Sequence, residues 1–394
     1  MPTYSAIEIV NRHRSEITAA INQTLSQRSA TGQVYEDGFP DPALLPFFPE
    51  TSYLTLEAAF MRFKHKRPVL ATIRGLDGDA PAQRETFDLS EQTVGNARIT
   101  SAVIWTEADQ LNLKKIADMR AAGGTGNVAA AAELEDVYKA TPIRLTDRWA
   151  NTLRMLCQRV SVLGKCLYTD PLTDIAVEID YTSLIPAGNL PTPLLTTARW
   201  DQLATADGIN DLKTHLNNVY ANIRMFPPAI GFPGPVADNL LDQAKTKERV
   251  ARYKMGITDG AAVDADAIAR LPRPTLEEVA AVLMRELTAS AQMSAQNISL
   301  VVTDAVYYSR DKAGNVNRAP YHPDGYYVFL WPNYIEAARF PVGTNNFAGG
   351  LAIVTDRSTY LPWWEKLAID GAGIPIVPDP RYIAARNVYN TPIT

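Results

Sequence analysis

The longest amphipathic pattern in the chain predicts a helix over residues 141–163. Apolar residues recur there at spacings of four and three, which place them on one stripe: Trp149, Leu153, Leu156, Val160 and Leu163. Thr141 suits the N-cap and Pro142 suits the first helical position. Gly164 follows the stripe and can adopt the left-handed conformation that ends helices. We therefore expect a long helix that starts at Pro142 and buries one face.

Other segments have weaker helical signals. Residues 6–28 contain apolar steps of three and four, which indicate an amphipathic helix or arm: Ile17, Ala20, Ile21 and Leu25. Thr275 and Glu278 have the spacing of a capping box, so a helix is expected over 275–290. Further helices are predicted over three segments: 107–121, the second half of 197–223, and 236–256.

β-prone segments flank a cluster of turn residues near the N-terminal third of the chain. Residues 67–74 are β-prone, 75–83 are rich in Gly, Asp and Pro, and 98–105 alternate between apolar and polar positions. We predict a two-stranded excursion over about 67–106, which another surface should hold because an isolated hairpin is marginal in water. Further strands and a hairpin tip are predicted over four segments: 174–181, 297–309, 311–315 (the tip) and 326–331.

Composition is that of a folded globular protein and excludes several classes. The 394 residues are 46% hydrophobic and 21% charged with a net charge of −5. The length allows two or three domains, or one large domain with insertions. With this net charge, binding of nucleic acid through bulk positive charge is not expected. Neither a membrane-spanning run nor a secretory signal is predicted. Cys157 and Cys166 are too few for a disulfide framework or a four-thiolate zinc site, so we expect buried or part-buried thiols in a reducing compartment.

Motifs that could bind ligands are weak. Residues 124–129 (GTGNVA) are similar to a dinucleotide-binding turn, but a predicted helix precedes them where that turn needs a strand. We interpret them as a glycine loop between helices. Asp77-Gly-Asp79 and Asp264-Ala-Asp266 lack the further oxygen ligands of a calcium loop and are interpreted as solvated turns. His322 has no second ligand nearby in sequence and is expected to be structural.

Signs of enzymatic chemistry are also missing from the sequence. It contains no G-x-S-x-G, H-E-x-x-H, P-loop or C-x-x-C motif, although a site assembled only in space stays open. Six aromatic residues are expected to pack in the core or against another subunit rather than to stack on a sugar or base: Trp331, Trp363, Trp364, Phe329, Tyr326 and Tyr327. We predict no catalytic residue, no metal ligand and no cofactor, and interpret the chain as a structural or assembly protein.

The order of these elements resembles that of a known family. An N-terminal arm precedes the β excursion, and the helix at 141–163 ends at Gly164 with the strand 174–181 behind it. A capped helix at 275–290 and a strand that ends in proline, 326–331, come later. This order resembles the major capsid proteins of tailed phages, the lambda-like head proteins with the Hong Kong 97-type fold. The resemblance covers about residues 50–390.

The resemblance implies an α+β fold with an N-terminal arm, an E-loop hairpin, a peripheral domain with a long spine helix, and an axial domain. It divides the chain as follows: arm 1–52, E-loop region 53–106, peripheral domain 107–183, axial domain 184–355, and C-terminal return to the core 356–394. Domain borders in this fold are discontinuous. The excursion would reach over a neighbouring subunit. Its mixed charges would suit ion pairs that set the register between subunits: Arg74, Asp77, Asp79, Arg84, Glu85 and Asp88.

The function implied by the resemblance is a shell subunit that assembles with itself as hexamers and pentamers around double-stranded phage DNA. The location would be the virion, after assembly in the host cytoplasm, with no membrane partner and no sequence-specific DNA contact. Scaffolding, portal and cement or decoration proteins are implied partners. Some relatives weld their shells through an E-loop lysine. Residues 67–106 contain no lysine, and Lys64 and Lys66 lie at the base of the excursion, so a non-covalent shell is expected.

Two alternatives stay open at this point. A cellular compartment shell of the encapsulin type would have the same fold and load a protein cargo, although its cargo-peptide groove cannot be identified in this sequence. A multidomain α+β hydrolase would be a monomer or small oligomer with a deep pocket and convergent titratable residues.

Overall fold

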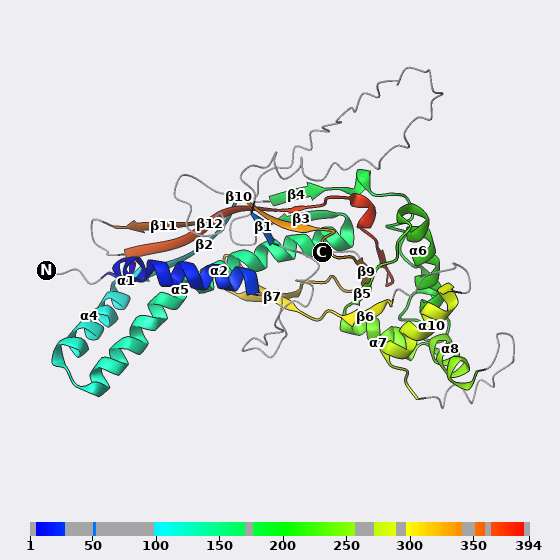
Figure 1. Ribbon diagram of the computed structural model, residues 1–394, viewed down its shortest axis with the longest axis horizontal. Helices are drawn as coiled ribbons and strands as arrows, with labels where there is room; N and C mark the ends of the chain where they lie inside the picture. Colours follow the sequence, from blue (N-terminus) through cyan, green and yellow to red (C-terminus); the bar gives the residue numbers. More distant parts are fainter. Residues whose placement is uncertain are drawn as a thin grey trace, which may run out of the picture.

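The structure, a computed structural model, describes the following residues, and all structural statements below refer to them: 5–27, 50–52, 98–169, 176–256, 272–288, 297–340, 351–358 and 364–389. The chain is a mixed α+β protein of elongated shape with two connected regions (Figure 1). One region is built around a long helix and a five-stranded sheet. The other is built around a four-stranded sheet and a group of shorter helices.

The five-stranded sheet is organised by its longest strand, β12 (Trp364–Ile376). Strand β2 (Arg98–Thr106) pairs antiparallel with the first nine residues of β12. On the other side of β12 lie β11 (Ala352–Arg357) and β10 (Glu336–Phe340), both antiparallel to it. Strand β1 (Glu50–Ser52) is parallel to β10. Segments far apart in sequence thus form one sheet because they all pair with, or next to, the C-terminal strand.

Helix α5 (Thr125–Leu163) has 39 residues and lies along this sheet. At 1.5 Å per residue it is about 58 Å long. The expected buried stripe is confirmed, since Trp149, Leu153 and Leu156 are buried. The end is also as expected, because Gly164 takes the left-handed conformation with φ of 67°. The expected start at Pro142 is wrong, and the helix begins 17 residues earlier.

The correction has a local cause. Residues 125–141 are rich in Ala and Glu, which are strong helix formers, so the helix continues through Pro142. The Thr141 hydroxyl donates a hydrogen bond to the carbonyl oxygen of Val137, four residues back, as side chains inside a helix do. The glycine run 124–129 therefore includes the N-cap and first turn of α5 rather than a whole loop. The segment before it is helical, as predicted.

Two glycines let α5 approach the sheet closely. A Cβ atom on Gly371 of β12 would lie 2.6 Å from Leu351 Cδ2 and 3.1 Å from Trp149 Nε1. A Cβ atom on Gly373 would lie 3.1 Å from the Trp149 ring. The indole Nε1–H of Trp149 also donates to the carbonyl oxygen of Gly371 at 3.4 Å. The tryptophan therefore occupies the space that side chains at these strand positions would need.

Three further helices pack around α5. Helices α1 (Ala6–Arg12) and α2 (Arg14–Gln27) lie along it, which confirms the helical prediction for the N-terminal segment. Helix α4 (Glu107–Ala122) runs directly on from β2 and forms a helical hairpin with the first part of α5. This α4–α5 hairpin extends away from the sheet at the lower left of Figure 1.

The second region has a four-stranded sheet in the order β13-β9-β5-β6. Its strands are β5 (Ala229–Phe232), β6 (Ser299–Val302), β9 (Tyr326–Leu330) and β13 (Ala385–Asn387). Strands β5 and β6 are parallel, and the other pairs are antiparallel. Four helices accompany it: α6 (Gly208–Ile223), α7 (Gly234–Asp242), α8 (Ala244–Met255) and α10 (Leu276–Thr288). The described residues also contain three short 3-10 turns: Thr182–Leu184, Thr196–Ala198 and Pro380–Tyr382.

Two elements of this region are broken where the pattern predicts continuity. The expected helix over 236–256 is interrupted at Gln243, whose buried side chain accepts a hydrogen bond from the Gly208 backbone N–H at 2.7 Å. The expected strand over 297–309 is interrupted after Val302, because the Thr303 backbone N–H donates to the carbonyl oxygen of Phe232 at 2.7 Å and turns the chain. In both cases a contact with a distant segment decides the break.

Beyond the break, the chain forms an antiparallel ribbon of two strands, β7 (Val306–Arg310) and β8 (Val316–Pro320). A second ribbon, β3 (Lys165–Thr169) and β4 (Ala176–Asp180), follows α5 directly. Neither ribbon has a third strand among the residues that the structure describes. In Figure 1 the β3–β4 ribbon lies above α5 and β7 lies below it.

Aromatic side chains form the core of the second region. Tyr327 stacks on Trp200 with ring centroids 5.5 Å apart, and Phe232 and Phe329 lie next to Tyr327. All four are buried, as is Trp331. This confirms packing as the role of Tyr327, Phe329 and Trp331. Trp363 lies outside the described residues. No helix of the described chain is long and apolar enough to cross a bilayer.

Candidate assembly surfaces

The excursion predicted over 67–106 is described only from Arg98 onward. The six charged residues expected to contact a neighbouring subunit all lie outside the described part: Arg74, Asp77, Asp79, Arg84, Glu85 and Asp88. The described end of the excursion is β2, which among the described strands forms an edge of the five-stranded sheet. Ile104, near the C-terminal end of this edge strand, is 57% exposed. An edge strand with an exposed apolar side chain can pair with another chain.

The opposite edge of the sheet is β11, and it shares a face with β2. Ile104 of β2 and Asp356 of β11 flank Lys366 of β12 in one cross-strand row. Ala102 and Val354 lie in the next row of the same face, and both are exposed. The face directed to α5 carries the buried Trp105 and Leu367 instead. On the face away from α5, the exposed apolar side chains thus lie on the two outer strands, and Ala368 between them is buried.

A buried carboxylate docks the N-terminal helices on this sheet. Glu365 of β12 is 1% exposed, and its Oε2 accepts the backbone N–H groups of Ala6 at 2.9 Å and of Ile7 at 3.3 Å. These donors belong to the first turn of α1, where a helix has free N–H groups and a partial positive charge. Glu365 therefore caps a helix that lies 359 positions earlier in the chain.

A second buried carboxylate lies where α5 meets α4 and the first two helices. Glu135 of α5 is 3% exposed and forms ion pairs with Arg120 of α4 and with His13, between α1 and α2, at 3.3 Å from Nε2. His13 Nδ1 also lies 3.0 Å from Glu16 Oε2. Losing Glu135 would remove this partner from the Arg120 guanidinium and from His13 Nε2, and loss of a buried charge partner is costly.

The α4–α5 hairpin exposes apolar side chains. Leu111 of α4 is 61% exposed, and Val128 and Val137 of α5 are about half exposed. Near the base of the hairpin, the Trp105 ring packs against Tyr138 with centroids 5.9 Å apart. The base of the hairpin is thus held by aromatic packing within the chain. Other positions on the hairpin expose apolar side chains to solvent.

The two ribbons share one anchor on α5, the side chain of Arg159. Its guanidinium lies over the Tyr168 ring of β3, 5.9 Å from the centroid, and donates to the carbonyl oxygen of Leu167 at 3.5 Å. It also donates to the hydroxyl of Tyr307 on β7 at 3.4 Å. Tyr307 packs edge-on against Tyr321. Each ribbon therefore directs one face toward Arg159 and the other face away from it.

The tip of the β7–β8 ribbon is structured, as the sequence predicts for 311–315. The Asn315 backbone N–H donates to Asp311 Oδ1 at 2.8 Å, and its side-chain amide donates to Oδ2 at 3.0 Å. Hydrogen bonds from Asn315 lower the pKa of Asp311. Gly314 adopts φ of 88°, which favours glycine. The ribbon is thus a preformed projection, and its outer side chains need little ordering on contact.

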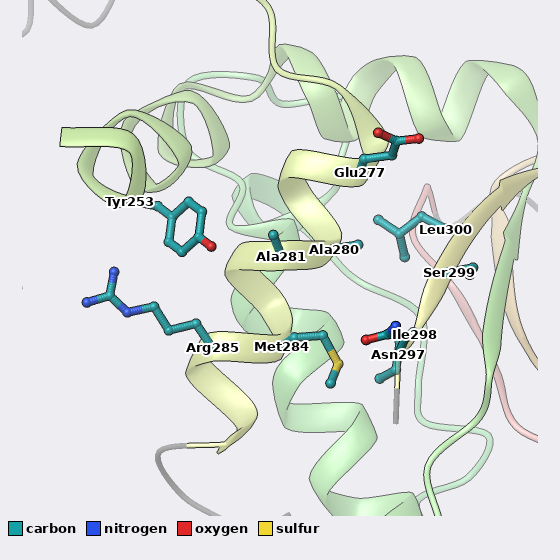
Figure 2. Close-up of a pocket in the computed structure, with 10 residues that line it drawn as sticks. All are labelled: Tyr253, Glu277, Ala280, Ala281, Met284, Arg285, Asn297, Ile298, Ser299 and Leu300. Atoms are coloured by element: carbon teal, nitrogen blue, oxygen red, sulfur yellow. The ribbon is translucent and has the colours of Figure 1, made fainter. Parts of the chain in front are cut away.

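An open hollow lies between α10 and β6 (Figure 2). Ala280, Ala281 and Met284 line it from the helix, and Ile298 and Leu300 line it from the strand side. The described charged residues at its border are Glu277 and Arg285. The Arg285 guanidinium lies 5.5 Å from the centre of the Tyr253 ring. The hollow brings together no nucleophile and base, so it does not have the form of a catalytic site.

The most strongly shifted histidines and thiols lie in packed cores. Burial lowers the pKa of His215 to about 4 and of His322 to about 3. His215 Nε2 lies 3.0 Å from the carbonyl oxygen of Asn189 and Nδ1 lies 2.9 Å from the Tyr327 hydroxyl, so the neutral ring bridges them. His322 Nδ1 lies 2.7 Å from the Thr303 hydroxyl, which confirms its structural role.

Both cysteines are buried free thiols, as expected. Burial raises the pKa of Cys166 to about 11. No group of three or more possible metal ligands occurs among the described residues. Asp264 and Asp266 lie outside them.

Sequence reasoning did not find Glu365, Glu135 or Arg159. Each is a single charged residue in a segment that otherwise reads as ordinary helix or strand. The one available signal was Glu365 itself, a charged residue in the largely apolar segment 361–369, because a charge that becomes buried there requires a partner. The two ribbons were partly predicted, since the tip at 311–315 and a strand over 174–181 were expected.

Comparisons with known proteins give structural matches only. The chain matches no family model, and no curated protein is significantly similar to it in sequence. A protein described as a capsid protein of a prophage in Escherichia coli CFT073 is 13% identical with a TM-score of 0.44, covering 75% of this chain and 77% of that one. A chain of the satellite phage P4 procapsid is 8% identical with a TM-score of 0.38, covering 82% and 80%.

The encapsulin complex of Synechococcus elongatus PCC 7942 is also similar. Its chain is 9% identical with a TM-score of 0.35, and the match covers 76% of each chain. The solved structures to which the chain is similar thus include phage capsid proteins and an encapsulin.

Proposed function

We propose that the chain is the major subunit of an icosahedral shell, assembling with itself as hexamers and pentamers around double-stranded phage DNA. The observation that carries the proposal is the elongated architecture, in which the α4–α5 hairpin extends from one end (Figure 1). Apolar side chains are exposed on this hairpin and on both two-stranded ribbons. Two-stranded ribbons are marginally stable alone, so contacts beyond the chain are expected to hold them.

In a shell, the α4–α5 hairpin and the two ribbons would make contacts with neighbouring subunits. Exposed apolar residues occur on the hairpin and on both ribbons: Leu111, Val128, Val137, Leu167, Tyr308 and Val316. A symmetric shell repeats each contact many times, so interfaces of modest size can add up to a stable particle. Scaffolding, portal and cement proteins would complete the assembly. The proposal assigns no catalytic activity to the chain.

Size-exclusion chromatography and negative-stain electron microscopy test the proposal directly. The protein would be expressed alone and together with the genes next to its own. Closed shells, or rings of five and six subunits, are the expected products. A monomer or dimer under every salt and partner condition would refute the shell and direct attention to a hydrolase with a site formed only in space.

The contents of the particles distinguish a phage capsid from a cellular compartment. Nuclease-protected double-stranded DNA inside particles purified from the native source is expected for a capsid. A protein cargo without DNA would refute DNA enclosure and favour the encapsulin-type alternative.

The shell is proposed to be held together without covalent bonds between subunits. Residues 67–106 contain no lysine, the residue that welds subunits in some capsid proteins through an isopeptide bond. Denaturing electrophoresis of mature particles should therefore show one band at the chain mass of 43.3 kDa. A ladder of multiples of this mass that survives boiling in detergent and reductant would contradict it.

A further inference from the structure

The two ribbons carry opposite charge. Residues 306–320, the β7–β8 ribbon and its tip, contain three basic residues and one acidic residue. Residues 165–180, which hold β3 and β4, contain four acidic residues and one lysine. The single acid of the first ribbon, Asp311, is bonded within its own tip. The ribbons therefore differ in sign although they have the same form.

The outward face of β7–β8 combines aromatic, aliphatic and basic side chains. Tyr308 lies directly opposite Arg318 in the ladder and is 50% exposed. Val316, two residues before Arg318 on the same face, is 59% exposed. Tyr307 is on the other face, where it meets Arg159. Tyrosine and arginine are enriched among the residues that dominate binding energy at protein interfaces.

The outward face of β3–β4 is complementary in character. Leu167 is 53% exposed and lies directly opposite Glu178, which is also exposed. Asp180 lies on the same face opposite Lys165, and hydrogen bonds from Thr182 lower the pKa of its carboxyl. The inner face carries the buried Cys166 and Ile179. An apolar residue thus stands among acids, where the other ribbon has apolar residues among bases.

We propose that the outward face of β7–β8 docks on the outward face of β3–β4 in a second copy of this chain. Within one chain the two faces cannot meet, because each ribbon turns its other face toward the shared Arg159. A contact between two different surfaces is head-to-tail, and it closes into a ring when the rotation fits. Charge pairs at such a contact select partner and register more than they add affinity. This inference rests on the proposed shell function and names one of its contacts.

Charge exchange tests the contact. Arg318→Glu and Glu178→Arg each place like charges opposite each other in the docked pair, and the double variant restores opposite charges with the signs exchanged. Each single variant is expected to lower the yield of particles or rings about tenfold or more at low salt. The double variant is expected to recover most of the wild-type yield. Arg148→Glu is a matched control, because Arg148 is exposed on α5, away from both faces.

The readouts separate the possible failures. Circular dichroism and thermal melting of the dissociated subunits establish that each variant folds. Folded single variants that assemble like the wild type, or a folded double variant that does not recover, would overturn the proposed contact. Failure of the wild-type protein to form rings or shells would instead refute the shell function itself.

Discussion

Glu365→Gln tests how the N-terminal helices are held. The Glu365 carboxylate is buried and accepts the first two backbone N–H groups of α1 at 2.9 and 3.3 Å. Glutamine keeps the shape and one acceptor oxygen, but it removes the charge and replaces the other oxygen with a donor. Both N–H groups bond to one oxygen, Oε2, so the glutamine carbonyl can keep these two hydrogen bonds and the substitution isolates the contribution of the negative charge.

The expected cost follows from the contacts. Hydrogen bonds to a charged group contribute about 1.5–3 kcal/mol, and a negative charge at a helix N-terminus adds about 0.3–1 kcal/mol. Because one acceptor remains, we expect a loss of about 1–2 kcal/mol, a factor of roughly 5–30 in the opening equilibrium. Val10, Ile17 and Ile21 stay buried, and burial of each contributes about 1.5–3 kcal/mol. The helices should therefore remain docked but open more often.

Amide hydrogen exchange by mass spectrometry measures this opening. Peptides covering residues 6–21 should exchange about 5–30 times faster in Glu365→Gln, while α10 should be unchanged. Glu8→Gln is the matched control, because Glu8 is an exposed carboxylate in the first turn of the same helix. Unchanged exchange in Glu365→Gln, or an equal effect of both substitutions, would refute the cap.

Three further predictions concern the two cores. Gly371→Ala should lower the free energy of unfolding by about 1–3 kcal/mol, because the new methyl group meets the tryptophan ring and a leucine. Burial lowers the pKa of His215 to about 4 and of His322 to about 3, so the unfolded chain binds more protons below pH 6.5. Stability should fall as pH drops from about 6.5 to 4, by about 3 kcal/mol for His215 alone. Cys157 and Cys166 should resist a thiol reagent at pH 8 until denaturant is added.

For each of these three predictions, a control variant or a measurement can give a result that contradicts it. Gly126→Ala, in the open first turn of α5, should be neutral or stabilising, so equal destabilisation at both glycines would remove the packing argument. A melting temperature independent of pH between 6.5 and 4 would contradict the buried neutral histidines. Rapid labelling of either thiol in the folded protein would show that the cores open easily.

Local signals in the sequence were reliable where all donors and acceptors of a cap or turn lie within a few residues of one another. Thr275 and Glu278 form the predicted capping box, with the Thr275 hydroxyl accepting the Glu278 N–H at 3.3 Å and the Glu278 carboxylate accepting the Thr275 N–H at 3.1 Å. Gly164 ends α5, and the tip at 311–315 forms as expected. The donors and acceptors of each cap or turn are close in sequence, so distant packing does not change them.

The start of α5 shows how such a signal misleads. Thr141 and Pro142 have the residue types of a helix start, but the segment before them is helical too. A proline removes one hydrogen bond from a helix interior, and the packing of residues on both sides offsets that loss. Ala131 and Tyr138, both buried before the proline, belong to the same packed face as Leu145 after it. The start signal at Thr141 and Pro142 was thus outweighed by the helix-forming residues before it and by burial on both sides of the proline.

The sequence by itself determined the element types, the buried stripe of the long helix and the order of segments from which the capsid-like architecture is inferred. Tertiary structure alone decided which distant groups meet: Glu365 with the start of α1, Glu135 with Arg120 and His13, and Arg159 with both ribbons. Periodicity reports the local geometry of a segment because neighbours in sequence share one backbone. A buried charge meets its partner only when distant segments pack together in the fold. The local pattern of a single sequence does not show which distant segments will be neighbours.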